Sequence, residues 1–280
     1  RGVDLSGLQT AFWRTVLAAA VYAAALAAAG RRLSRRQLWL SAPAGLAIGA
    51  ELGVFFIALK TTTIANATLI GALQPIVLLV FGARRFGERV SGRILGMSLI
   101  ALGGVAMVVL GSTSQPIWSP GGDALAFAAM LLFAAYYVFA KRARAGVPAF
   151  EFQTAVWIWA GLLLLPAAAI ETGGLDFPGW STWLWLSTLV AVPGTGHLLM
   201  NWAHGRTRLT TAAVVSLGLP VLSTVGAAIF LSESITGWQY PGIVIVVVSL
   251  TAVIRRSNDV GGAADPPEGA ATAPRPGRPA

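Results

Sequence analysis

Glu51 is the side chain in this sequence whose chemical type fits its surroundings least. It lies near the middle of an apolar segment, Leu38–Leu59, where an ionised carboxylate costs about 2.5–3.5 kcal/mol if lipid surrounds it. A carboxylate placed there either faces a cavity, where it can bind a ligand or exchange a proton, or is held between helices as a hydrogen-bonded structural group. The sequence allows both interpretations.

His197 and Arg14 are further polar candidates inside apolar segments. Histidine has an unperturbed pKa of about 6.5, so His197 can exchange a proton under cellular conditions, or it can simply bond a neighbouring backbone carbonyl. Arg14 lies one or two turns inside the first segment. It can bind a ligand carboxylate or extend to the outer interface, and its position near the segment start favours the interface.

A larger group of side chains is polar or amphipathic and lies at depths compatible with a cavity. Each alone also fits ordinary helix packing, but together they suit a ligand held by aromatic walls and a few orienting hydrogen bonds. The group is Gln74, Tyr136, Tyr137, Trp157, Trp159, Asn201 and Trp202. We expect no metal and no cofactor, because the chain has no cysteine and two histidines.

The composition indicates what kind of protein positions these residues. Charged residues make up only 11% of the chain, against about 25% in soluble domains. Hydrophobic residues make up 56% and the mean hydropathy is +0.71, which excludes a soluble globule and a disordered chain. Apolar segments near the roughly 20 residues that span a bilayer predict an all-α polytopic membrane protein. There are nine: Leu8–Ala29, Leu38–Leu59, Thr63–Ala83, Gly92–Gly111, Gly122–Lys141, Phe150–Ile170, Ser181–Trp202, Leu209–Leu231 and Gln239–Ile254.

The basic residues predict the orientation of the chain. If the segments alternate across the membrane, fifteen basic residues fall in loops on one side and only Lys60 falls on the other. The positive-inside rule assigns the fifteen, and with them the C-terminus, to the cytoplasm. This placement in every second loop also argues against a nucleic-acid partner. The fifteen are Arg31, Arg32, Arg35, Arg36, Arg84, Arg85, Arg89, Arg93, Lys141, Arg142, Arg144, Arg206, Arg208, Arg255 and Arg256.

An internal repeat relates the third and eighth segments. Pro75 is followed thirteen residues later by Glu88, and Pro220 by Glu233 at the same spacing, so the offset between the copies is 145 residues. Because the copies are five segments apart, an odd number, they must have opposite orientations, which is typical of inverted-topology repeats in membrane carriers. The same offset relates His197 to position 52, next to Glu51.

Prolines, glutamates and glycines of these segments suggest local structure. Pro75 and Pro220 distort their helices at matched depths and free backbone carbonyls for a pathway. Glu88 and Glu233 are interpreted as structural capping or pairing groups rather than ligand contacts. Glycines at four-residue spacing predict close helix approach within the chain or in a homodimer; they are Gly45, Gly49 and Gly53, and Gly92 with Gly96.

The repeat also divides the chain into parts. We expect a first repeat over residues 1–111, an external linker over 112–121, a second repeat over 122–254 and a disordered cytoplasmic tail over 255–280. The counterpart of Gly122–Lys141 would lie before residue 1. The first repeat is therefore expected to lack its opening helix here, and the full protein to have ten helices with both termini in the cytoplasm.

The sequence resembles the EamA-like carriers of the drug/metabolite transporter superfamily over residues 8–254. The resemblance is carried by AFWRTVLAAA around Arg14, by FFIALKTTTIANATLIGALQP, by GARRFGERVSGRILGMSLIALGGVAMV and by its second copy, PVLSTVGAAIFLSESITGWQYPGIVIVV. The chain departs from the family pattern at Ser234 and Pro241, where Arg or Lys and Gly are more usual. The resemblance implies two five-helix repeats and alternating access for small metabolites, without a catalytic site.

We therefore expect a secondary transporter in a bacterial inner membrane that exports an amino-acid-like or drug-like metabolite, with proton coupling through Glu51 or His197. A structural or sensory membrane protein is the alternative, since the composition alone would also fit one. An intramembrane enzyme is disfavoured, because the sequence has no GxSxG or HExxH motif. The expected partners are a small-molecule substrate, the lipid bilayer and a second copy of the chain.

Overall fold

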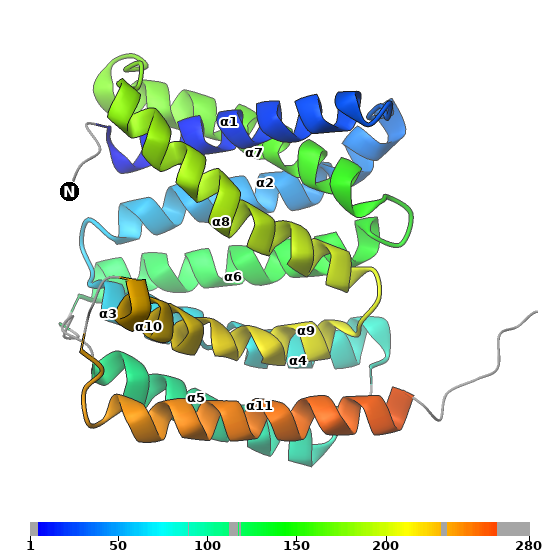
Figure 1. Ribbon diagram of the computed structural model, residues 1–280, viewed down its shortest axis with the longest axis vertical. Helices are drawn as coiled ribbons and strands as arrows, with labels where there is room; N and C mark the ends of the chain where they lie inside the picture. The colour runs from blue at the N-terminus through cyan, green and yellow to red at the C-terminus, as the bar shows by residue number, and fades with distance from the viewer. Residues whose placement is uncertain (1–4, 89, 112–116, 118, 231–233, 262–280) are drawn as a thin grey trace, which may run out of the picture.

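The computed structural model describes residues 5–88, 90–111, 117, 119–230 and 234–261, and every regular element among them is a helix (Figure 1). In chain order the helices are α1 Gly7–Ala28, α2 Arg35–Ala58, α3 Ile64–Gly71, α4 Gln74–Phe86, α5 Gly92–Leu110, α6 Pro120–Ala143, α7 Ala149–Thr172, α8 Trp180–His204, α9 Leu209–Val215, a 3₁₀ turn Ser216–Gly218, α10 Leu219–Phe230 and α11 Gln239–Gly261.

Seven helical segments of the described chain are long and apolar enough to cross a membrane. They are Gly7–Ala28, Arg35–Ala58, Ile64–Phe86, Gly92–Leu110, Pro120–Ala143, Ala149–Thr172 and Leu209–Ile229. The apolar part of α11, Gln239–Arg255, is shorter than these. α8 has 25 residues but is not among the seven, since serine, threonine, histidine and asparagine interrupt its apolar residues.

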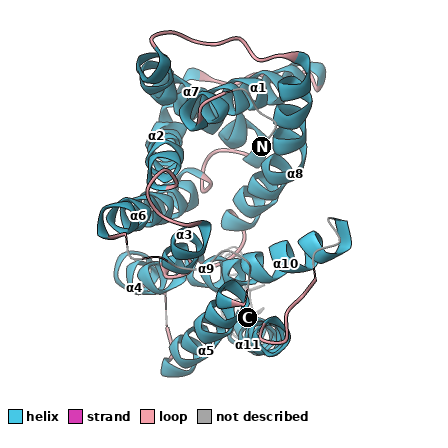
Figure 2. Ribbon diagram, turned by 90° about the vertical axis from the view of Figure 1, so that its left-hand side faces the viewer, coloured by secondary structure: helices cyan, strands magenta, loops and turns pink. Residues whose placement is uncertain are grey.

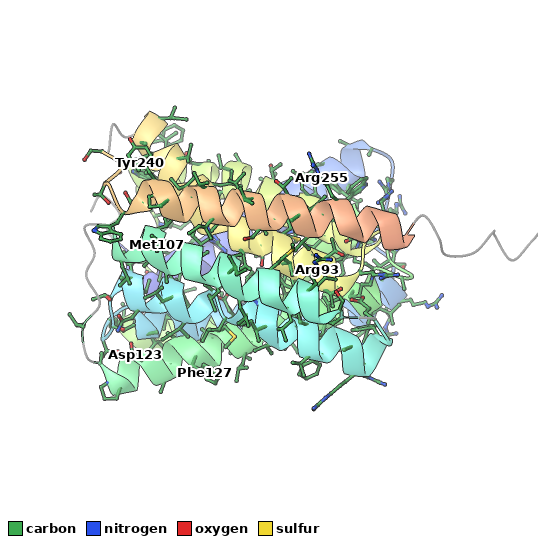
Figure 3. The ribbon with its side chains drawn as sticks, turned by 90° about the horizontal axis from the view of Figure 1, so that it is seen from below. Arg93, Met107, Asp123, Phe127, Tyr240 and Arg255 are labelled. Atoms are coloured by element: carbon green, nitrogen blue, oxygen red, sulfur yellow. The ribbon has the colours of Figure 1, made fainter. Side chains whose placement is uncertain are left out.

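The helices lie side by side, and successive helix ends alternate between two ends of the bundle (Figure 1). We call one of these the basic end, because it holds the arginine-rich α1–α2, α4–α5, α6–α7 and α8–α9 loops. Figure 3 shows Arg93 and Arg255 toward this end and Asp123 and Tyr240 toward the opposite end. At the opposite end Lys60 forms an ion pair with Glu171.

Two segments that the sequence predicted as continuous are broken. Thr63–Ala83 divides into α3 and α4, and Leu209–Leu231 divides into α9, the 3₁₀ turn and α10. In each case a proline, Pro75 or Pro220, occupies the second position of the new helix. A proline has no N–H group and is tolerated in a first helical turn but not in the middle of a helix, so the chain starts a new helix there.

Helix boundaries recur at the offset of the sequence repeat. α2 begins at Arg35 and α8 at Trp180, α3 begins at Ile64 and α9 at Leu209, and α4 begins at Gln74 and α10 at Leu219. All three pairs of starts are 145 residues apart. The two breaks therefore occupy corresponding positions in the two halves of the chain.

Small residues set the closest helix contacts. A Cβ added to Gly45 would lie 2.5 Å from Trp159 Cβ, and one added to Gly49 would lie 2.9 Å from Ala160 Cα, so α2 packs directly on α7 as the spacing predicted. Gly92 and Gly96 have nothing within 4 Å of such an added Cβ. Their predicted role in packing is therefore wrong within this chain.

Paired helices close the two edges of the bundle. α1 lies along α7 at one edge and α5 along α11 at the other (Figures 1 and 2). At the second edge a Cβ on Gly104 would be 2.9 Å from the Gly242 carbonyl oxygen, and one on Gly242 would be 2.7 Å from the Gly104 carbonyl oxygen. The backbones of α5 and α11 thus meet without side chains between them.

Four helices start with a hydroxyl side chain that accepts a hydrogen bond from the third residue of the helix. Ser6, Ser34, Thr63 and Ser91 cap α1, α2, α3 and α5 in this way, satisfying one of the backbone donors that a helix start leaves free. α9 has no such cap, because Arg208 at its N-cap position makes no side-chain bond there.

α11 extends beyond residue 255, the position at which the sequence predicted the start of the tail. α11 continues to Gly261, because Arg255, Arg256 and the next polar residues extend the helix beyond its apolar stretch. Residues 262–280 and most of the predicted linker, 112–116 and 118, lie outside the described residues.

Candidate functional site

A cavity of about 350 Å³ lies where the two broken helices meet α2 and α6. Its wall contains corresponding residues of the two breaks: Gly71 and Ser216, Ala72 and Leu217, Gln74 and Leu219, Pro75 and Pro220, all 145 residues apart. Because the prolines lack an N–H group, the carbonyls of Gly71 and Ser216 have no partner of the usual helical kind. The remaining lining residues are Glu51, Phe55, Ala67, Thr68, Ala126, Ala129, Met130 and Phe133.

Glu51 supplies the acidic group of this cavity. The side chain is half-buried, and among the described residues its carboxylate forms no hydrogen bond and no ion pair within 4 Å. Of the two interpretations that the sequence allowed, the contacts favour a carboxylate that faces a cavity over a structural group bonded between helices. No lysine or arginine lines the same cavity, so a cationic or hydrogen-bond-donating ligand group fits here.

Gln74 supplies the second polar group. It is 4% exposed, and its amide nitrogen has no hydrogen-bond partner among the described residues. A buried donor without a partner is costly, so this nitrogen is suited to a ligand acceptor. Phe55, Met130 and Phe133 give the rest of the wall an apolar character.

Arg14, Trp157 and His197 form a separate cluster between α1, α7 and α8. The guanidinium carbon of Arg14 lies 5.7 Å from the centre of the Trp157 ring. The centre of the His197 ring lies 5.5 Å from the centre of the same Trp157 ring. Arg14 therefore points into the bundle, and the interfacial position that the sequence favoured is wrong. All three residues line a small pocket together with Pro193 and Gly194.

Glu51 and His197 line different pockets, although their positions nearly correspond in the two halves. Arg14 lines the pocket of His197 and not that of Glu51. The residues expected to share one site are thus divided between a main cavity with Glu51 and Gln74 and a neighbouring cluster with Arg14, Trp157 and His197.

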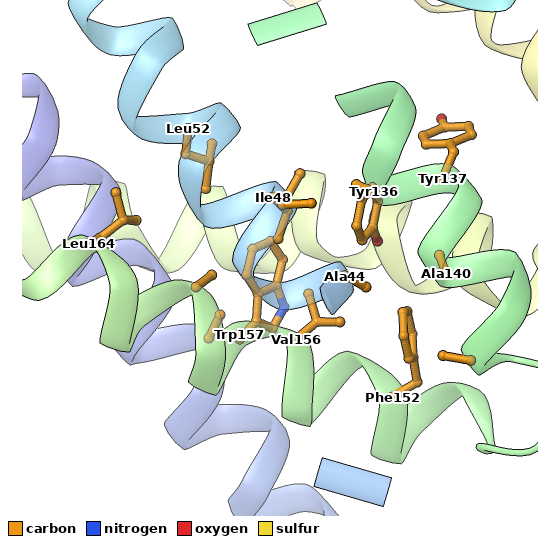
Figure 4. Packing of buried hydrophobic residues seen from close by; sticks show 14 of the residues in the cluster. Ala44, Ile48, Leu52, Tyr136, Tyr137, Ala140, Phe152, Val156, Trp157 and Leu164 are labelled. Atoms are coloured by element: carbon orange, nitrogen blue, oxygen red, sulfur yellow. The ribbon is translucent and has the colours of Figure 1, made fainter. Parts of the chain in front are cut away.

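Tyr136 and Asn201 belong to a fully buried network rather than to the cavity wall. The Tyr136 hydroxyl donates to Asn201 Oδ1 at 2.8 Å, and the Asn201 amide donates to Gln153 Oε1. Tyr137 lies edge-on to His204, with ring centres 4.7 Å apart. Figure 4 shows both tyrosines among the packed residues of α2, α6 and α7.

The sequence analysis missed Gln153 and His204, both fully buried. A single polar residue in an apolar segment gives little signal, since it also fits packing. The spacing of Asn201 and His204, three residues apart on α8, would have placed both on one helix face. Trp159 and Trp202 contribute little to a site: Trp159 donates to the Leu38 carbonyl at 2.9 Å, and Trp202 is 50% exposed.

A larger groove adjoins the cavity on the side of the opposite end. It has a volume of about 840 Å³ and shares Thr68, Leu219 and Pro220 with the cavity. Gly111, Thr236 and Gln239 line its outer part, near the helix ends that lie farthest from the basic end. Among the described residues, the groove thus extends from the cavity toward the opposite end of the bundle.

Glu88 lies apart from both pockets, at the basic end. Its carboxylate accepts hydrogen bonds from the backbone N–H groups of Leu209 and Thr210, at 2.7 and 2.9 Å. These contacts support the prediction of a capping group over that of a ligand contact. Its counterpart in the repeat, Glu233, lies outside the described residues.

Comparison with known proteins places the chain in a family. The model of the EamA-like transporter family matches residues 2–110 and 120–255. A solved protein structure, described only as the crystal structure of a protein, superimposes with a TM-score of 0.77 at 21% identity, over 91% of this chain and 90% of that one. This similarity concerns the fold alone.

Two curated relatives carry the name probable amino-acid metabolite efflux pump. The protein of Escherichia coli strain K12 is 26% identical over 66% of this chain and 65% of its own length, less than two thirds of it. The protein of Salmonella typhimurium is 27% identical over 74% of this chain and 73% of its own length. Together with the helical segments described above, the family match indicates a multi-pass membrane protein. The chain belongs to the EamA-like transporter family.

Proposed function

We propose that this chain exports a small amino-acid-like metabolite by alternating access, and that the cavity between the two broken helices is its substrate site. The observation that carries this proposal is that corresponding residues of the two halves line one cavity at their breaks. Secondary transporters bind their substrates at such interruptions between structural repeats. The direction of transport rests on the names of the two curated relatives.

The architecture in this proposal is nine membrane helices in two inverted repeats, over residues 1–111 and 122–254. The recurrence of helix starts at 145 residues supports it, as do the two matched stretches of the family model. In this arrangement α3 with α4, and α9 with α10, each cross the membrane as one interrupted helix. A homodimer stays a prediction, and among the described residues nothing lies within 4 Å of a Cβ added at Gly92 or Gly96.

The proposed orientation has the basic end in the cytoplasm of a bacterium, with the protein in the inner membrane. The arginine-rich loops all gather at that end, and such loops are retained in the cytoplasm. The cavity then opens outward, because the groove that reaches it lies at the opposite end. The described conformation is in this proposal the outward-facing state of the transport cycle.

The substrate class follows from the cavity wall. An ammonium group fits the Glu51 carboxylate, an acceptor fits the amide nitrogen of Gln74, and an apolar body fits Phe55, Met130 and Phe133. The volume of 350 Å³ is close to the lower limit of about 300 Å³ for small-molecule pockets. This favours a metabolite of amino-acid size.

Proton coupling is proposed to run through Glu51, with His197 as a second group. The Glu51 carboxylate has no bonding partner among the described residues, so it is free to take either a proton or a cationic substrate. Exchange of a proton for a substrate at one carboxylate would couple export to the proton gradient.

The test is uptake of labelled amino acids into proteoliposomes under an imposed pH gradient. We expect Glu51→Gln to abolish gradient-driven transport and His197→Ala to reduce it, because an amide cannot exchange a proton. Asp176→Asn is the matched control, since Asp176 lies in the exposed α7–α8 loop and should leave transport unchanged. Full gradient-driven transport by both variants would refute coupling, and no transport by any form would refute the function.

A further inference from the structure

Glu88 joins two elements that are distant in the sequence at the basic end of the bundle. It follows α4 after Gly87, whose φ of 63° is the left-handed conformation that lets the chain turn away from the helix. The Glu88 carboxylate then spans to the start of α9, where Oε1 accepts from Leu209 N and Oε2 accepts from Thr210 N. Both of its oxygens are used on this one helix start.

The start of α9 has no cap of its own. Arg208 at the N-cap position provides no side-chain acceptor, whereas α1, α2, α3 and α5 each have a serine or threonine there. The first N–H groups of a helix have no acceptor within the helix. Glu88 therefore satisfies, from another element, donors that would otherwise be unpaired when α4 and α9 are in contact.

The contact is shaped to accept this carboxylate. A Cβ added to Gly82 of α4 would lie 2.7 Å from Thr210 Cγ2 and 3.1 Å from Glu88 Oε2, so only a residue without a side chain lets α9 come so close. Lys141 of α6 donates to the Thr207 carbonyl, and its positive charge acts on Glu88. Three elements of the basic end, α4, α6 and the α8–α9 loop, thus meet around Glu88.

The same two helices line the cavity at their other ends. α4 begins with Gln74 and Pro75, and α9 leads into Ser216 and Leu217, which all face the cavity. A route from the cavity to the basic end between these helices requires α4 and α9 to separate. While the Glu88 carboxylate accepts hydrogen bonds from Leu209 N and Thr210 N, α4 and α9 are held together at the basic end.

We propose that Glu88 is a positioning residue of the transport cycle: its two hydrogen bonds to the start of α9 keep the pathway closed at the basic end, and they break when the cavity opens to that side. The inference goes beyond the proposed function and depends on it only for alternating access. Substrate does not touch Glu88; the residue acts through α9.

The chain has no cysteine, so an introduced thiol can report access to the cavity without background. Ala72→Cys places the thiol in the cavity wall, and Ala145→Cys in the exposed α6–α7 loop marks the basic face. Labelling by a membrane-impermeant maleimide is measured from each face, in intact cells and in inverted membrane vesicles. With Glu88 present, we expect Ala72→Cys to react from the opposite face and only slowly from the basic face.

Glu88→Ala should raise the labelling rate of Ala72→Cys from the basic face by about tenfold, the population shift expected when a charge-assisted contact is lost. Glu88→Gln retains one acceptor oxygen and should have an intermediate effect. Glu151→Gln is the matched control, since it breaks the ion pair with Arg31 between α1 and α7 at the same end and should leave the rate unchanged.

The proposal would be overturned if Glu88→Ala elutes as a folded protein and the labelling rate of Ala72→Cys from the basic face is unchanged in it. If Glu88→Ala does not fold, the rate of Glu88→Gln decides in the same way. An equal increase of the labelling rate in Glu151→Gln would also overturn the proposal, because the loss of any contact at the basic end would then be enough to open the cavity to that side. The assay needs no substrate, so it separates failure of this inference from failure of the proposed function.

Discussion

Gln74 and Glu51 share the cavity but relate differently to the protein around them. Glu51 is only half-buried, whereas Gln74 is almost entirely buried with a donor that lacks an acceptor. Other buried polar atoms of the described residues also lack a partner, including the amide nitrogen of Gln153, but Gln74 is the one of them that lines the main cavity. The arrangement fits a group whose partner is the substrate.

Replacement of Gln74 by leucine tests this at the level of one side chain. Because the amide nitrogen loses no protein hydrogen bond, we expect Gln74→Leu to change the free energy of unfolding by less than about 0.5 kcal/mol, while substrate binding weakens by about tenfold. Calorimetric titration with transported amino acids and thermal unfolding of the same preparation measure the two effects. A large loss of stability with unchanged binding would show that Gln74 is structural.

At the scale of elements, the sequence predicted the helices well and their interruptions poorly. Long apolar runs fix where helices lie, so eleven helical segments of the structure fall within or beside the nine predicted ones. The breaks at Ala72–Leu73 and at Ser216–Gly218 hardly change the hydropathy, because each is only two or three residues long and contains one small polar residue at most. Pro75 and Pro220 indicated a distortion, but only the fold shows that both distortions line one cavity.

The inward direction of Arg14 was not predictable for a related reason. A position near a segment start is compatible with an interface or with the interior, and the choice depends on Trp157 and His197, which other helices supply. The spacing of residues along one helix does not show which side chains the neighbouring helices contribute. The closeness of Glu51 and His197 in the repeat likewise did not predict that they line separate pockets.

The contact of α2 with α7 gives a prediction for an element pair. A Cβ at Gly49 would lie 2.9 Å from Ala160 Cα, so Gly49→Ala should force the helices apart and lower the free energy of unfolding by about 1–3 kcal/mol. Gly96→Ala is the control, since nothing lies within 4 Å of an added Cβ; it should stabilise α5 by about 0.5–1 kcal/mol. Denaturation in detergent compares the two variants, and equal effects would contradict the packing argument.

For the whole molecule, the charge distribution predicts sidedness. A green fluorescent protein fused at the C-terminus should be fluorescent, because the basic end is proposed to face the cytoplasm. An alkaline phosphatase inserted after Lys60, at the opposite end, should be active in the periplasm. Fluorescence and phosphatase activity are measured in whole cells. An inactive phosphatase together with a non-fluorescent C-terminal fusion would show the opposite orientation.

The crossing of α5 and α11 has a consequence for how this chain can vary. Alanine at Gly104 or at Gly242 would bring a methyl group within 2.9 or 2.7 Å of the facing carbonyl oxygen. A substitution at either residue therefore forces α5 and α11 apart. One helix belongs to the first half of the chain and the other to the second. A substitution in one half of the chain at this crossing therefore has to be accommodated by a helix of the other half.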